Sequence, residues 1–363
     1  MEAFGQSVIN KPKKITTEIE LAATVRQYFF LLLLTVGRKN YTSMAREADK
    51  TYEEVFVPKD TLVEKIEYVE KQQIKAINDS STEENVGKLV IDFTMLIKQY
   101  SELIEKTTYD WEGCNASVKK GVVVGVAAWT NGKITIPLTL RPWLRLKDAG
   151  DAYKKKSDIT QTIILEAKKV IKFNEVLLDG AFVSVTMLIF YSSENISFTA
   201  RIPRNRKITT ADGVCDQLQN HPAFKLKKNE KYRTVEATIK GMPFYFTTEK
   251  RRGKNNTTEV VFIVSNVKST PKKTVTRYAM RSRIECFFRT AKQLLGANDC
   301  QSTSWNKQRY HIAVIMYAYA CLQRARYDKK IKNVEAIVHV LRRQKTSLLA
   351  NEYIDLIETF MKP

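Results

Sequence analysis

The chain has 363 residues, enough for roughly two or three domains, and 44% of the residues are hydrophobic. Sixty Lys and Arg residues stand against 39 Asp and Glu residues, which leaves a net charge of +21. Residues 200–270 have 15 basic and 6 acidic side chains and residues 271–345 have 17 and 4, whereas residues 1–199 have 27 and 26. This local excess predicts a polyanionic partner, either nucleic acid or an acidic membrane surface.

Several classes of protein are disfavoured by what the sequence lacks. The longest apolar run, Tyr28–Val36, has 9 residues, whereas a membrane-spanning helix needs about 20. No signal peptide is evident. The 5 cysteines form no C-x-x-C pair, which favours reduced thiols over disulfides or a zinc site. There is no glycine-rich phosphate-binding motif. We therefore expect a cytoplasmic protein without a membrane partner.

The first 87 residues are expected to be helical. Apolar spacing predicts helices over residues 17–36, 42–49 and 60–77. A helix, a short turn and a second helix are compatible with a DNA-binding helix-turn-helix, and also with a plain helical bundle. The near-zero charge of this part favours the bundle. Residues 1–87 are thus expected to form a small helical N-terminal region, with binding of a DNA end left open as its role.

From residue 88 the pattern changes to strands. Strands are predicted over residues 88–93, 118–129 and 133–140. The pair Asn131-Gly132, which is favoured in tight hairpin turns, separates the last two. An amphipathic helix over residues 158–173 and a buried strand over residues 175–179 follow. This order predicts an α/β fold with a mixed sheet, one hairpin and one crossover helix.

The following stretch, residues 196–270, is basic and rich in strands, predicted at residues 196–202, 233–239, 243–248 and 259–264. Helices are predicted again after Pro271, at residues 276–295, 307–327 and 333–343, and a tail follows from 346 to 363. The strand-rich stretch is therefore expected to be an insertion that interrupts the α/β domain.

Three carboxylates stand out by their context. Asp92 and Asp179 end predicted strands, and Glu285 lies in the predicted helix 276–295. Like charges that converge at one edge of a sheet repel one another and need a counter-charge. Hard oxygen ligands suit Mg²⁺, and two such ions can assist phosphoryl transfer. The three residues are therefore candidate metal ligands and catalytic residues.

The helix that carries Glu285 has an unusual polar stripe. Tyr278, Arg281, Glu285 and Lys292 follow one another at intervals of 3, 4 and 7 residues. On a helix with 3.6 residues per turn these positions share one face. Arg and Lys there could bind phosphates on either side of a metal-bound scissile bond.

These residues resemble a known family. The set Tyr278-x2-Arg281-x3-Glu285-x6-Lys292 is similar to the YREK signature of bacterial DDE insertion-sequence transposases, and the segment Leu294–Ser302 also resembles that family. The resemblance covers about residues 88–325. It implies an RNase H-like catalytic domain in two parts, residues 88–195 and 271–345, around the basic insertion at 196–270.

The resemblance also implies the activity and the roles of the residues. Asp92, Asp179 and Glu285 would bind Mg²⁺ or Mn²⁺, while Tyr278, Arg281 and Lys292 would contact the phosphates of the transposon end. A cut-and-paste transposase would bind double-stranded DNA, both transposon ends and target, as a homodimer in the bacterial nucleoid. The exposed cluster Lys250, Arg251 and Arg252, expected in a loop, adds candidate phosphate contacts that carry no sequence information.

Four points stay open at the level of sequence. Asp110 competes with Asp92 as the first ligand, although Asp92 directly ends an apolar strand. The resemblance implies a DNA hairpin intermediate less strongly than it implies DNA cleavage, because residue 282 is a serine and the insertion contains no Trp. A catalytically inactive or repurposed DNA-binding protein, or another RNase H-like nuclease, would have the same fold. The short N-terminal region would also fit a truncated chain.

Overall fold

The structure is a computed structural model that describes residues 18–51, 55, 61–113, 116–253, 256–344 and 348–361. The predicted starts of the first and third helices, at residues 17 and 60, lie outside these ranges. The element order is mixed α/β throughout. None of the described helices is long and apolar enough to cross a membrane.

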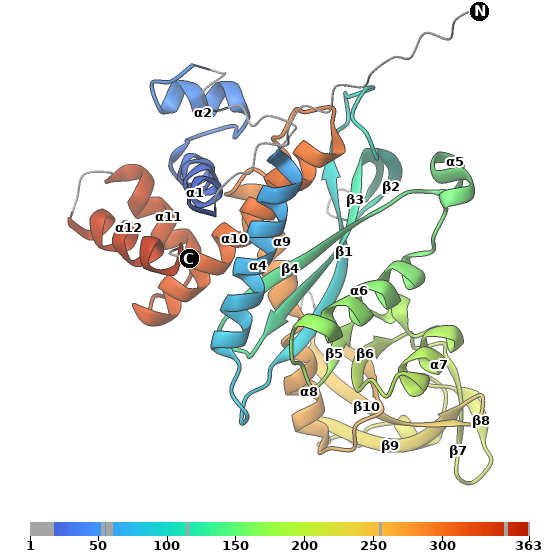
Figure 1. The fold of residues 1–363 in the computed structure, drawn as a ribbon. Coiled ribbons are helices and arrows are strands. Elements are labelled where there is room, and N and C mark those ends of the chain that lie inside the picture. Colours follow the sequence, from blue (N-terminus) through green and yellow to red (C-terminus); the bar gives the residue numbers. More distant parts are fainter. Residues whose placement is uncertain are drawn as a thin grey trace, which may run out of the picture.

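Five strands form the layer on which the fold is built, and they follow the order β4-β3-β1-β5-β6 across the sheet (Figure 1). Their bounds are β1 Lys88–Ile97, β3 Ser117–Thr130, β4 Thr135–Trp143, β5 Val176–Leu178 and β6 Phe198–Ile202. The pairs β4–β3 and β3–β1 are antiparallel, whereas β1–β5 and β5–β6 are parallel. Three antiparallel strands followed by two parallel ones form the mixed RNase H-like sheet that was expected. The predicted fold class is thus confirmed.

Two details of this layer differ from the predictions. β1 runs on to Ile97, four residues beyond the predicted end, because β3 is long enough to pair with it up to Ile97↔Gly121. The predicted hairpin at Asn131-Gly132 is confirmed, but its loop has four residues, Asn131–Ile134, between Thr130 and its partner Thr135. The Asn131 side chain closes this loop by accepting hydrogen bonds from the amides of Lys133 and Ile134.

Further strands extend the same sheet on both sides. Next to β6 lies β11 (Thr258–Ser265), followed by β10 (Met242–Arg252), β9 (Tyr232–Ile239), β7 (Lys207–Thr210) and β8 (Cys215–Gln217). On the other side, β2 (Thr108–Glu112) pairs with β3. The short strands β2, β7 and β8 had not been predicted, because runs of three to five residues carry little periodicity. One 11-stranded sheet therefore runs through the molecule.

Each face of the sheet has its own hydrophobic core. Side chains alternate between the faces along a strand, so Val122, Val124 and Val126 of β3 lie in one core and Ala127 and Trp129 in the other. Helices α6 (Lys156–Val170) and α7 (Val185–Ser193) cover the face of Trp129. Helices that pack around residues 305–328 cover the face of Val124 (Figure 1).

The helices on the face of Val124 form a bundle around α10 (Trp305–Asp328), most of which is buried. Its members are α1 (Glu18–Leu34), α2 (Tyr41–Glu47), α4 (Leu62–Ser80), α9 (Ser282–Gln293), α11 (Val334–Arg343) and α12 (Leu348–Met361). The hydroxyl of Tyr28 in α1 lies 2.8 Å from His311 Nδ1 in α10. Phe29 and Leu32 are fully buried. The N-terminal helices are thus packed into the core that supports α9.

Candidate active site

Asp92 and Asp179 lie side by side on neighbouring parallel strands. In the register of β1 and β5, Val90 pairs with Leu177, and two residues further along each strand come Asp92 and Asp179. Residues in register point to the same face of the sheet, here the face covered by α9 and α10. Asp179 directly follows β5, as expected, whereas Asp92 lies in the middle of β1. Two aspartates 87 positions apart are therefore brought together by strand pairing alone.

Glu285 approaches them from α9, which packs against β1. The single predicted helix over 276–295 is wrong: the structure has α8 (Pro271–Ala279) and α9, with a break at Met280 and Arg281. At the break the Arg281 amide donates to Tyr278 O at 2.9 Å and the Ile284 amide donates to Arg281 O at 3.2 Å. Such i to i−3 bonds tighten the backbone into a 3₁₀-type turn.

The Arg281 guanidinium lies between the three carboxylates. Its Nη2 is 2.8 Å from Asp92 Oδ2 and 3.9 Å from Asp179 Oδ2, and its Nη1 forms an ion pair with Glu285 Oε1. The Arg281 side chain is only 15% exposed, whereas Asp179 and Glu285 are 45% and 55% exposed. The cluster is thus closed toward the sheet and open toward solvent on the side of Asp179 and Glu285.

Burial and mutual charge shift the pKa values in this cluster. Burial raises the pKa of Asp92, and the neighbouring Asp179 and Glu285 add to the shift, although Arg281 and the Phe93 amide oppose it. Burial disfavours the charged form of Arg281, but the carboxylates of Asp92, Asp179 and Glu285 prevail and its pKa is raised. Burial also raises the pKa of Tyr278 to about 12, so this phenol keeps its proton at neutral pH.

The donor set suits a hard divalent cation. Three carboxylates from two strands and one helix already converge on a positive group, and oxygen ligands of this kind are those that Mg²⁺ and Mn²⁺ prefer. As the described side chains stand, no group of three His, Cys, Asp or Glu residues is arranged to hold a metal ion. The reason lies in the geometry, because the Arg281 guanidinium occupies the space between the carboxylates. A metal ion would have to displace it.

Asp110, the competing aspartate, lies on the other face of the sheet. It pairs with Lys119 in β3, whereas Asp92 pairs with Val126, and these two β3 positions face opposite sides. The Asp110 carboxylate accepts from Lys156 Nζ of α6 at 2.7 Å. Strand β3 also separates it from β1. The geometry therefore groups Asp92, and not Asp110, with Asp179 and Glu285.

The other predicted site residues are spread more widely. Tyr278 is in the last turn of α8, and its pKa responds to the charges of Arg281 and Asp179. Lys292 is in the last turn of α9. Lys250, Arg251 and Arg252 belong to the end of β10 and not to a loop, because the pairing with β11 continues to Arg252↔Thr258. Strands β6 and β11 lie between β10 and β5, so these three residues are apart from the carboxylates.

Arg201 is a charged neighbour of the cluster that the sequence reasoning missed. Leu178 of β5 pairs with Ala200 of β6, and one residue further in this register Asp179 stands opposite Arg201. The sequence signal was present in the segment RIPRNRK, residues 201–207, which places three arginines and a lysine at the end of a buried strand and directly after it.

A family model matches part of the chain. Residues 147–321 match the transposase DDE domain. The matched segment includes Asp179 and Glu285, whereas Asp92 lies before it. This segment is thus similar to the family that the sequence motif resembles.

The likeness to solved structures is remote. An Argonaute from Kluyveromyces polysporus, solved with a guide RNA, is 8% identical with a TM-score of 0.29, and the match covers 74% of this chain and 35% of that one. The NurA nuclease from Sulfolobus solfataricus is 11% identical with a TM-score of 0.27, and the match covers 77% and 98%. This chain thus spans about a third of the Argonaute chain. A search of curated proteins found no significant match.

Proposed function

We propose that the chain is a DNA transposase that cuts the ends of an insertion sequence and joins them to target DNA. The observation that carries this proposal is the convergence of Asp92, Asp179 and Glu285 on a single guanidinium beside the carboxyl end of β5. Ligands in open α/β sheets bind outside the carboxyl ends of the strands. The match of residues 147–321 to the transposase DDE domain supports the same reading.

In this proposal the three carboxylates hold Mg²⁺ or Mn²⁺. When bound, the metal would activate the attacking oxygen and stabilise the leaving oxygen of the phosphodiester. The sheet fixes the positions of Asp92 and Asp179, whereas Glu285 is on α9, the helix that begins beside Arg281. Arg281 offsets part of the negative charge of the three carboxylates and, once displaced, would be available to a DNA phosphate. Tyr278 stays protonated and can donate a hydrogen bond to phosphate.

The finer points of the proposal rest on the charge distribution and on the resemblance. Residues 88–195 and 271–345 would form the catalytic domain around the insertion at 196–270. The basic excess between residues 200 and 345 would bind the ends, with Lys292, Lys250, Arg251 and Arg252 among the phosphate contacts. Pairing of two ends in a cut-and-paste reaction would require a homodimer on the DNA, in the bacterial nucleoid.

A cleavage assay tests the proposal. The substrate is a labelled duplex that carries the inverted repeat flanking the chain's own gene, with Mg²⁺ or Mn²⁺. We expect a discrete metal-dependent cut at the repeat end, and a loss of at least about 100-fold in Glu285→Ala, as is typical when one member of a catalytic group is removed. The matched control is Glu236→Ala, an exposed glutamate on β9, which should cut like the wild type.

Two other outcomes would replace the proposal. Salt-sensitive binding of the duplex without any cut by the wild type would indicate an inactive or repurposed DNA-binding protein. Metal-dependent cutting of RNA–DNA hybrids, without a preference for the repeat, would indicate another RNase H-like nuclease.

A further inference from the structure

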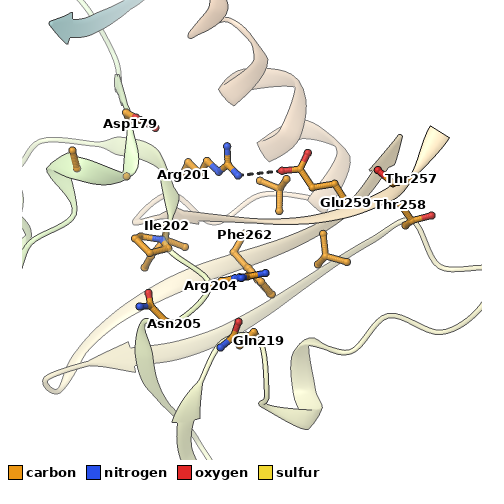
Figure 2. A pocket seen from close by; sticks show the side chains of 15 residues that line it. Asp179, Arg201, Ile202, Arg204, Asn205, Gln219, Thr257, Thr258, Glu259 and Phe262 are labelled. Atoms are coloured by element: carbon orange, nitrogen blue, oxygen red, sulfur yellow. Dashed lines mark hydrogen bonds and ion pairs between the residues drawn. The ribbon is translucent and has the colours of Figure 1, made fainter. Parts of the chain in front are cut away.

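A deep cleft begins at Asp179 and leads away from the carboxylates toward the inserted strands (Figure 2). Its cavity volume is about 1130 Å³. The lining includes Gly180 and Ala181 after β5, and residues 257–262 at and directly before the start of β11. It also includes residues 201–205, which are the end of β6 and the turn that follows it, and Gln219. The cleft therefore continues the candidate active site past the end of β6.

The free charge in this cleft is positive. Arg204 and Asn205 are exposed, and the described residues offer no hydrogen bond or ion pair to either side chain. The one acidic side chain of the inner wall, Glu259, is held by Arg201 at 3.2 Å and by Arg251 at 3.0 Å. Its charge is thus already balanced, and the Arg204 guanidinium is left for an anion from outside.

The lining also contains the groups that bases require. The exposed apolar side chains of Pro203 and Val260 line the cleft together with the amides of Asn205 and Gln219, and Figure 2 labels these two amides. Amides can pair with base edges, and apolar surfaces accept the faces of unstacked bases. The volume lies just above the ~300–1,000 Å³ that is typical of sites for small organic ligands, the scale of a few nucleotides and not of a duplex.

A second cavity of about 580 Å³ continues the path. It shares Pro203 and Asn205 with the first and adds Arg206, Lys207 and Lys240. No acidic side chain lines it. Basic side chains thus follow the path from the carboxylates to the far edge of the insertion.

We propose that this cleft binds an unpaired DNA strand next to the scissile phosphate, with Arg204 on a phosphate and Asn205 on a base edge. The inference rests on the proposed function, because the strand must also pass the carboxylate cluster at Asp179. It assigns a binding role to Arg204 and Asn205 of the turn after β6. Duplex DNA flanking the cut is bound elsewhere, on the broader basic surface.

Fluorescence anisotropy without metal tests the binding site separately from cleavage. The probes are a blunt duplex, the same duplex with a four-nucleotide single-stranded extension, and a ten-nucleotide oligothymidylate. The wild type should bind the extended duplex about tenfold more tightly than the blunt one, the effect of one or two hydrogen bonds to charged groups. The double variant Arg204→Ala/Asn205→Ala should lose this difference and keep its affinity for the blunt duplex.

The control variant is Lys228→Ala, an exposed lysine of the insertion outside both cavities, which should keep the tenfold difference. A wild type that binds the blunt and the extended duplex with equal measurable affinity, or a double variant that retains the preference, would overturn the inference. If only the oligothymidylate binds, and its binding depends on Arg204, the result supports the inference about the cleft and contradicts the proposed function. If the cleavage assay shows a cut at the repeat but the anisotropy assay shows no preference for the extended duplex, the result supports the proposed function and contradicts the inference about the cleft.

Discussion

At the scale of single residues, Arg281 is the centre of the site. One guanidinium, 15% exposed, pairs with three carboxylates that come from three separate segments of the chain and so offsets part of their charge. Without it, Asp92, Asp179 and Glu285 would repel one another more strongly in a partly buried place. In the proposed function, the arginine and a divalent cation would therefore compete for the same oxygens.

This competition predicts the behaviour of Arg281→Gln. The variant should bind Mn²⁺ roughly tenfold more tightly than the wild type in the absence of DNA, since the metal no longer has to displace a charged group; tenfold corresponds to about 1.4 kcal/mol. Isothermal titration calorimetry measures it directly. Arg283→Gln, which removes an exposed arginine that bonds only to the Gly132 carbonyl, is the control. Equal Mn²⁺ affinities in all three proteins would contradict the role given to Arg281.

The sequence identified the members of this cluster but not their arrangement. Asp92 and Asp179 could be singled out because both end predicted apolar strands, and Glu285 because of the polar stripe around it. The ion pairs of Arg281 could not be predicted, because they depend on where the helix breaks. Arg201 was missed since its significance comes from the register of β5 and β6, which a single sequence does not reveal.

At the scale of elements, α8 is fixed to the sheet by a buried ionic group. Glu175, 3% exposed at the start of β5, pairs with Lys88 Nζ at 2.7 Å and lies 3.7 Å from Arg277 Nε of α8. It also accepts a hydrogen bond from Thr199 of β6. One carboxylate thus joins β1, β6 and α8, and so sets the position of Tyr278 beside the cluster.

Substitution of this carboxylate should be costly. Glu175→Gln leaves Lys88 and Arg277 largely buried without their counter-charge, so we expect the free energy of unfolding to fall by about 3 kcal/mol. Urea denaturation followed by circular dichroism measures the loss. Glu166→Gln, which breaks a half-exposed pair with Arg141, should cost less than about 1 kcal/mol. Similar losses in the two variants would show that the buried group does not anchor α8.

Long elements were predictable and short ones were not. The β-branched run that became β3 and the apolar spacing of α10 are strong periodic signals. The break between α8 and α9 was missed because both sides are amphipathic on the same face and no Pro or Gly marks it. The strand containing Asp110 was missed because it has only five residues.

At the scale of the whole molecule, one sheet connects the candidate active site with the basic strands. β6 pairs with β5 on one side and with β11 on the other, so the insertion is continuous with the layer that carries Asp92 and Asp179. The sequence predicted a basic, strand-rich insertion from its charge, its strand pattern and the family resemblance. It could not show that these strands join the same sheet, since pairing between distant segments leaves no local pattern.

The central claim is that Asp92, Asp179 and Glu285 form one metal-dependent cutting site. Its most direct test compares Asp92→Asn with Asp110→Asn in cleavage of the labelled repeat duplex with Mn²⁺. The two aspartates lie on opposite faces of the sheet. We predict that Asp92→Asn loses at least about 100-fold in cutting rate, while Asp110→Asn cuts like the wild type. Normal cutting by Asp92→Asn, with loss in Asp110→Asn, would contradict the account.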